Sequence, residues 1–172
     1  MSGTGLEGSW KIVAGEKEGA PEPKEKIRGV KASIGREVGL SNWLPVTQDL
    51  IDGFAALTGD RQWIHVDAGR ARHESPFGAT VAHGFLTVAL LSRLVAEAVD
   101  VRVEAKMRVN YGFNRLRFPA PVTAGARIRA RVTPNAVHDV EGGTEIAWGV
   151  LVEIEDQAKP AVAAEWLVRI YY

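Results

Sequence analysis

The hydrophobic and polar positions of the chain follow a helical period before residue 100 and a strand-like period after it. From Thr47 onward apolar residues fall on one face of a helix, with Thr47 as its N-cap and Gly59 as its end. Asp67 is placed to cap a second, short helix over residues 68–72. The loop between the two helices spans residues 60–65.

Residues 84–99 form the longest apolar stretch, broken by Arg93 and Glu97. Its apolar positions cover nearly the whole circumference of a helix, which is typical of a buried helix. The stretch is shorter than the roughly 20 residues that span a bilayer, so a buried helix is favoured over a membrane span.

After residue 100 the hydrophobic positions recur with a period of two residues. Ile128, Ala130 and Val132 alternate with arginines, which predicts a strand with one buried and one wet face. Because helical patterns come first and strand patterns follow as an antiparallel meander, an α+β fold is predicted, with a curved sheet covering the apolar helix. The other predicted strands are 103–111, 144–155 and 161–171, with turn signals at 119–121, 142–143 and 156–160.

Composition narrows the classes of protein to be considered. Hydrophobic residues make up 46% and charged residues 24%, as in soluble globular domains. Lysine plus arginine number 21 and aspartate plus glutamate 21, so no overall field attracts nucleic acid or an anionic membrane. The chain has no cysteine, which excludes disulfides, thiolate metal sites and cysteine nucleophiles.

The N-terminal residues differ from the rest of the chain. Residues 15–26 contain no apolar side chain larger than alanine or proline, so a flexible extension is predicted over residues 1–30, followed by one domain over residues 31–172. The first 30 residues lack the apolar core of a signal peptide and the acid-poor character of a transit peptide. A cytoplasmic location is therefore expected.

Functional side chains gather in residues 58–67, between two helical patterns. Asp60 and His65 in one turn can hold the same water molecule, which suits the addition or removal of water. An equally weighted alternative is structural: Asp60 caps the turn, and His65 fills an edge of the core beside Trp63 and Ile64. The spacing alone does not choose between them.

Residues 54–67 (FAALTGDRQWIHVD) and 77–87 (FGATVAHGFLT) resemble the MaoC-like dehydratases, which include the R-specific enoyl-CoA hydratases. Gln-Trp-Ile-His and residues 110–119 are similar to the branch named after nodulation protein N, and the resemblance covers roughly residues 33–172. It implies a hot-dog fold, a homodimer or larger even assembly, and a coenzyme A or acyl-carrier thioester substrate. It implies no metal, nucleotide or redox cofactor.

The resemblance also implies roles for individual residues. Asp60 and His65 match the catalytic pair that holds the water added across the double bond, and the Gly84 N–H matches the oxyanion donor. Gly84 begins the predicted apolar helix, where unpaired N–H groups favour a developing enolate and glycine permits close approach. Gln62-Trp63 stands where the best-characterised hydratases carry Asn-Pro, which affects the expected pocket shape.

Three further histidines receive structural interpretations. His83 is interpreted as a support of the loop before Gly84, and His73 and His138 as surface residues. Because the four histidines are scattered without matching carboxylate spacing, no zinc or iron site is expected.

Basic residues on two predicted strands could meet the phosphates of coenzyme A. For Arg127, Arg129 and Arg131 an exposed strand face is favoured, and Lys106 and Arg108 leave the same two interpretations open. None is assigned as a binding residue.

Three functions compete. The first is reversible syn hydration of a trans-2-enoyl thioester to the R-3-hydroxyacyl thioester by Asp60 and His65. The second is thioester hydrolysis on the same fold. The third is a non-catalytic module that binds acyl thioesters, for which the Gln62-Trp63 departure is the argument.

Overall fold

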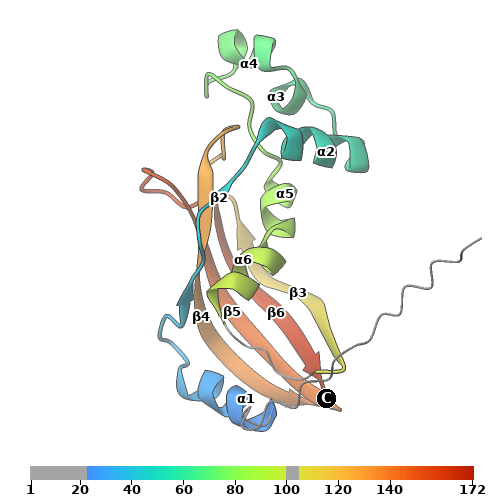
Figure 1. Ribbon diagram of the computed structural model, residues 1–172, viewed down its shortest axis with the longest axis vertical. Helices are drawn as coiled ribbons and strands as arrows, with labels where there is room; N and C mark the ends of the chain where they lie inside the picture. The colour runs from blue at the N-terminus through green and yellow to red at the C-terminus, as the bar shows by residue number, and fades with distance from the viewer. Residues whose placement is uncertain (1–22, 100–104) are drawn as a thin grey trace, which may run out of the picture.

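The computed structural model describes residues 23–99 and 105–172, in which a curved antiparallel sheet packs against helices (Figure 1). The helices are α1 (Pro23–Ala32), α2 (Gln48–Thr58), α3 (Trp63–Val66), α4 (Ala68–Glu74), α5 (Gly84–Ala89) and α6 (Leu91–Ala98). The strands are β1 (Gly39–Leu40), β2 (Leu44–Pro45), β3 (Met107–Arg117), β4 (Arg127–Val140), β5 (Gly143–Ile154) and β6 (Val162–Tyr171). The predicted α+β class is confirmed.

The sheet is not the simple meander expected from the order of the strand patterns. Its order is β1-β4-β5-β6-β3, with β2 also paired to β4, so only β4, β5 and β6 follow one another as neighbours. Strand β3 lies at the far edge beside β6, and the chain then returns to begin β4. A period of two identifies strands but not their partners, because pairing depends on packing against the helices.

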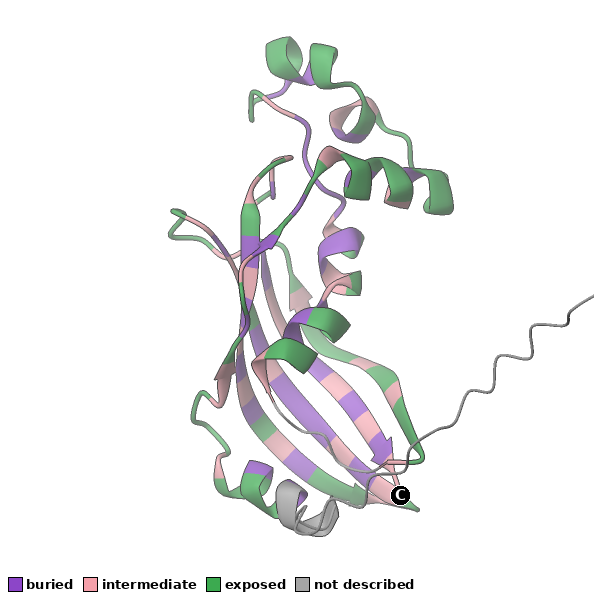
Figure 2. Cartoon of the chain, viewed as in Figure 1, coloured by how far each residue is buried: buried purple, intermediate pink, exposed green. Residues whose placement is uncertain are grey.

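The predicted apolar helix is divided into α5 and α6 at Leu90, and the pair packs on the concave face of the sheet (Figure 1). Leu91 and Leu94 are buried towards the sheet, whereas Phe85 is 68% exposed. Figure 2 shows the division into buried and exposed sides along α6. The expected burial on all sides is therefore wrong for a single chain, because the sheet covers one side of the helices.

Helices α2, α3 and α4 form one end of the molecule, beyond the sheet (Figure 1). The predicted caps are confirmed: Thr47 Oγ1 accepts from the Leu50 N–H at 3.3 Å, and Gly59 adopts φ +79°. Asp67 caps α4 by accepting from the Arg70 N–H at 2.8 Å. The expected loop over residues 60–65 ends in the helical turn α3, so His65 lies on a helix.

The packed region begins before residue 31. Residues 23–30 of the expected extension belong to α1, whose Ile27 and Val30 are buried in the core. These two apolar residues lie three positions apart, on one face of a helix, which gives α1 a surface to bury. The rest of the expected extension, like the start of the strand predicted at residue 103, lies outside the described residues.

None of the helices in residues 23–99 and 105–172 combines the length and the apolar character that a membrane crossing requires.

Candidate active site

Asp60 and His65, five residues apart in sequence, meet the more distant His83 between the helical end and the start of α5. Asp60 follows α2, His65 lies on α3, and His83 precedes α5. One carboxylate oxygen and one ring nitrogen from each histidine lie within 4.8 Å of one another. Two hydrogen bonds of about 2.8 Å reach across such a gap, so one water molecule can contact Asp60 and His65 together.

His65 is held from its ring and from its backbone. Its Nδ1 lies 2.6 Å from the carbonyl oxygen of Val81, and since a carbonyl only accepts, Nδ1 carries the proton of the neutral ring. Its side chain is buried, at 7% exposure. The Nε2 lone pair is therefore the one that can accept a proton from a bound water.

Gln48 and Thr80 fix the backbone around His65, and no motif or spacing pattern singles out either residue. Gln48 Nε2 donates to the His65 carbonyl oxygen at 2.8 Å, and Thr80 Oγ1 donates to Gln48 Oε1 at 2.5 Å. Thr80 is buried, at 2% exposure. These bonds join α2, α3 and residue 80 over separations of 17 and 32 residues, so no local pattern could reveal them.

Asp60 combines the two interpretations that the spacing left open. Its Oδ1 accepts from the Gln62 N–H at 3.4 Å, a long contact of the expected turn-capping kind. Its carboxylate is nevertheless 57% exposed and lies beside the two histidines. A turn contact therefore orients the carboxylate without occupying all of its acceptor positions.

His83 contacts both members of the expected pair. Its ring is stacked on that of His65, with centroids 3.7 Å apart and planes 24° apart, and the ring of Phe54 lies 5.1 Å away. His83 Nε2 lies 2.9 Å from the carbonyl oxygen of Asp60. The sequence-based interpretation as a loop support agrees with this bond, but the contact with His65 was not anticipated.

The cluster of Asp60, His65 and His83 raises the question of a metal ion, which the sequence did not predict. Their atoms are close enough for one ion. However, ring lone pairs lie in the ring planes, and the planes of stacked rings run nearly parallel. The two imidazoles therefore do not converge on one point, and each ring bonds to a backbone carbonyl oxygen, so the arrangement fits a metal centre poorly.

His65 and Gly84 border a mainly apolar cavity of about 390 Å³. A side chain at Gly84 would place its Cβ 2.9 Å from the ring of Phe118, so the absence of a side chain keeps this region open. The rings of Phe85 and Phe118 meet edge to face, 6.1 Å apart. The cavity is lined by Ile64, His65, Val81, Ala82, Gly84, Phe85, Thr87, Phe118, Ala120, Pro121, Val122 and Ala161.

The departure at Gln62-Trp63 lies outside this cavity. Trp63 packs under the guanidinium of Arg70, which lies 4.4 Å from the ring centroid, and Gln62 is exposed. Neither residue lines the cavity. His73 and His138 are exposed, as predicted.

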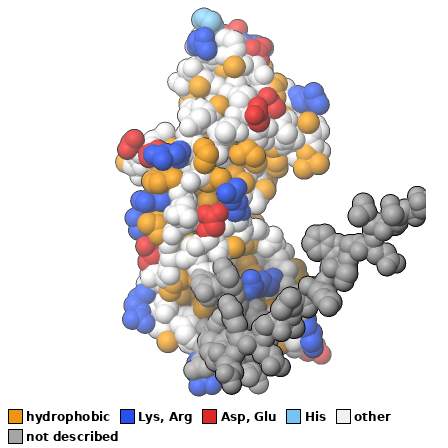
Figure 3. Space-filling model, in the orientation of Figure 1, with side chains coloured by type: hydrophobic (Ala, Val, Ile, Leu, Met, Phe, Trp, Pro, Cys, Tyr) orange, Lys and Arg blue, Asp and Glu red, His pale blue; other side chains and the backbone are white. Residues whose placement is uncertain are grey.

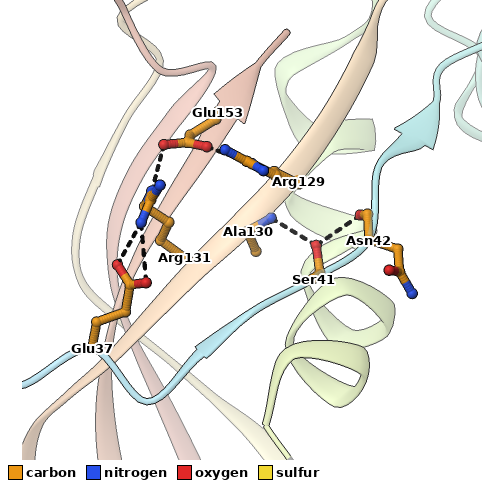
Figure 4. A network of polar contacts seen from close by, with 7 residues as sticks. All are labelled: Glu37, Ser41, Asn42, Arg129, Ala130, Arg131 and Glu153. Carbon is orange, nitrogen blue, oxygen red and sulfur yellow. Dashed lines mark hydrogen bonds and ion pairs between the residues drawn. The ribbon is translucent and has the colours of Figure 1, made fainter.

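The arginine face of β4 pairs with glutamates instead of remaining open for phosphate. Figure 4 shows Glu153 between Arg129 and Arg131, with Glu37 on the other side of Arg131. Burial alone would raise the pKa of Glu153, but hydrogen bonds from Arg131 and Arg129 outweigh it and lower that pKa. The ion pairs are Arg127–Glu155, Arg129–Glu153, Arg131–Glu153 and Arg131–Glu37. The favoured interpretation, a solvated strand face, agrees with this pairing.

Comparison with known proteins places the chain in a family. The model of the MaoC-like domain matches residues 30–154. The chain is 46% identical over 146 residues to 3-hydroxyacyl-thioester dehydratase Z of Mycobacterium tuberculosis, covering 84% of this chain and 95% of that protein. It is 42% identical over 142 residues to nodulation protein N of Rhizobium meliloti, covering 82% and 88%.

Solved structures share the fold. The MaoC-like dehydratase of Rhodospirillum rubrum superposes with a TM-score of 0.65 at 22% identity, over 80% of this chain and 92% of that one. The R-hydratase PhaJ1 of Pseudomonas aeruginosa gives a TM-score of 0.61 at 23% identity, over 80% and 81%. The expected hot-dog fold is thereby confirmed, and with these matches the chain belongs to the MaoC-like dehydratase family.

Proposed function

We propose that this protein catalyses the reversible, R-specific hydration of trans-2-enoyl thioesters to 3-hydroxyacyl thioesters, with coenzyme A or an acyl carrier as the thiol. The observation that carries the proposal is the approach of the Asp60 carboxylate and the His65 ring within 4.8 Å, with His65 and Gly84 bordering one apolar cavity. The names of the relatives, a 3-hydroxyacyl-thioester dehydratase and an R-hydratase, support the same reaction class.

In the proposed reaction, three groups of the site act together. Asp60 and His65 hold one water molecule, and Nε2 of His65 takes a proton as the water oxygen bonds to the β carbon. The π bond between the α and β carbons breaks, and its electron pair moves towards the thioester oxygen. The Gly84 N–H donates to that oxygen, and the pair returns a proton to the α carbon on the same face. No redox step is involved, so the atoms of one water account for the product.

We also propose a homodimer. Among residues 23–99 and 105–172, β3 pairs only with β6, which leaves its other edge open. Aromatic residues are exposed on β3 and on α5, including Tyr111 at 54% and Phe85 at 68%. In the space-filling view, hydrophobic side chains gather at the narrowing between the helical end and the sheet (Figure 3). A second copy would cover these groups and shield the exposed Asp60 carboxylate from bulk water.

The test of the reaction is the ultraviolet absorbance of crotonyl-CoA mixed with the protein. Hydration removes the conjugated enoyl chromophore, whereas binding alone preserves it, and hydrolysis would release a free thiol that a thiol reagent detects. Loss of absorbance without thiol release is expected. Release of thiol, or unchanged absorbance across enoyl thioesters of several chain lengths, would refute hydration.

The test of the residues uses matched controls. Asp60→Asn and His65→Ala should each lower the hydration rate about 10²- to 10⁴-fold, the usual contribution of a general acid–base group. Thermal melting should show that both remain folded. His138→Ala and Asp139→Asn, two exposed neighbours on β4, should retain the parent rate. A parent-like rate in either Asp60→Asn or His65→Ala would remove that residue from the mechanism.

A further inference from the structure

We propose that His83 is a positioning residue of this site, which sets the ring of His65 and the loop of Asp60 relative to each other; the inference rests on the proposed hydration. His83 is the residue that contacts both: its ring is stacked on His65 at 3.7 Å, and its Nε2 lies 2.9 Å from the Asp60 carbonyl oxygen.

The hydrogen bond fixes the tautomer of His83. A carbonyl oxygen can only accept, so Nε2 of the neutral ring carries the proton and Nδ1 carries the lone pair. His83 Nδ1 is buried and has no hydrogen-bond partner among the described residues. His83 therefore donates one hydrogen bond, to the backbone carbonyl of Asp60, and its own buried Nδ1 remains an unsatisfied acceptor.

The unsatisfied nitrogen distinguishes positioning from packing. A buried acceptor without a partner is destabilising, and a phenyl ring of similar shape would fill the space between Phe54 and His65 without it. Stability alone would thus favour phenylalanine at this position. What phenylalanine cannot supply is the N–H that holds the carbonyl of Asp60.

The stacked ring also restricts His65. The Nδ1 bond to Val81 anchors one edge of the His65 ring, and the face of His83 limits rotation about that anchor. The ring of His65 is thereby held in one orientation next to Asp60. The ring contact of His83 acts on His65, and its hydrogen bond acts on Asp60. Separate substitutions of His83 can therefore remove each interaction.

The experiment compares three substitutions by steady-state hydration and thermal melting. His83→Phe keeps a ring but removes the donor, His83→Gln keeps an N–H donor but removes the ring, and His83→Ala removes both. We expect kcat to fall at least 10-fold for His83→Phe and His83→Gln and further for His83→Ala, with KM changed less than 3-fold. The melting temperature of His83→Phe should equal or exceed that of the parent. Parent-like kcat in His83→Ala would overturn the proposal.

A second measurement tests whether His83 acts through its neighbour. His83→Gln, which removes the ring stacked on His65 but keeps an N–H donor, is combined with His65→Ala, and the residual hydration rate is compared with that of His65→Ala alone. Substituting a positioning residue should lower the hydration rate little once the group that it positions is absent. The rate of the double variant should therefore lie within about 3-fold of that of the single variant. Equal fold-losses in both backgrounds would refute the proposal. If the parent itself does not hydrate enoyl thioesters, the proposed function fails first, and nitrogen NMR of the His83 tautomer still tests the geometry: a proton on Nδ1 would refute it.

Discussion

Substitution of Gly84 separates the chemical role of this residue from its packing role. An alanine Cβ would lie 2.9 Å from Cε1 of Phe118, whereas ordinary contact begins at 3.4 Å, so the ring must retreat by about 0.5 Å. Phe118 is 45% exposed and can swing outward. Because alanine also has a higher helix propensity than glycine, by up to about 1 kcal/mol, we expect Gly84→Ala to change the free energy of unfolding by less than about 1 kcal/mol.

Substitution of Gly84 should lower the hydration rate much more than it lowers the stability. The N–H persists in the variant, but we expect the new methyl group to restrict the close approach of the thioester to it, and losing one oxyanion donor typically costs about 2.7–4 kcal/mol. Gly84→Val, with two further methyl groups, should therefore slow hydration about 10²- to 10³-fold. The assay is steady-state hydration of crotonyl-CoA beside thermal melting.

A double variant decides how the loss arises. Phe118→Ala removes the ring that a side chain at residue 84 would displace. If Gly84→Ala/Phe118→Ala recovered the rate of Phe118→Ala alone, the loss would come from the displaced ring, and the assignment of Gly84 as a donor that needs close approach would be refuted. A Gly84→Val variant that unfolds without first losing rate would likewise show a packing role only.

Three further predictions concern the scaffold. Gly39→Ala should lower the melting temperature clearly, because its Cβ would lie 2.0 Å from the backbone oxygen of Ala98, which cannot move without shifting α6. Glu153→Gln should lose about 0.5–1 kcal/mol of unfolding free energy at pH 7. Since the pKa of Glu153 is lowered on folding, its contribution is present above the unfolded value of about 4.3 and is lost as pH falls through the lower, folded-state value. Urea titrations should therefore show a larger difference between Glu153→Gln and the parent at pH 7 than at pH 3. Light scattering should give twice the 18.7 kDa of one chain, and a monomer at micromolar concentration would contradict the proposed dimer.

The sequence alone predicted the features that depend on short-range interactions. Thr47 and Gly59 bound α2 because a cap and a left-handed glycine act within one helical turn. The alternation of Ile128, Ala130 and Val132 with arginines determined which face of β4 is buried, because successive side chains in a strand point to opposite sides. Asp60 and His65 were predicted as a catalytic pair from a motif confined to one turn and its family resemblance, and their side chains do lie close together.

Tertiary packing decided what lies between segments that are distant in sequence. The contact of His83 with Asp60 spans 23 residues, and that of Gln48 with Thr80 spans 32, so no local period or cap encodes either one. The same limit explains the place of β3 beside β6 and the exposed side of α5 and α6, since strand partners and the covered side of a helix depend on how all the elements pack together. Residue types at short spacing therefore indicated which residues make up the candidate site, whereas its supporting contacts arise only when the helical end folds over the start of α5.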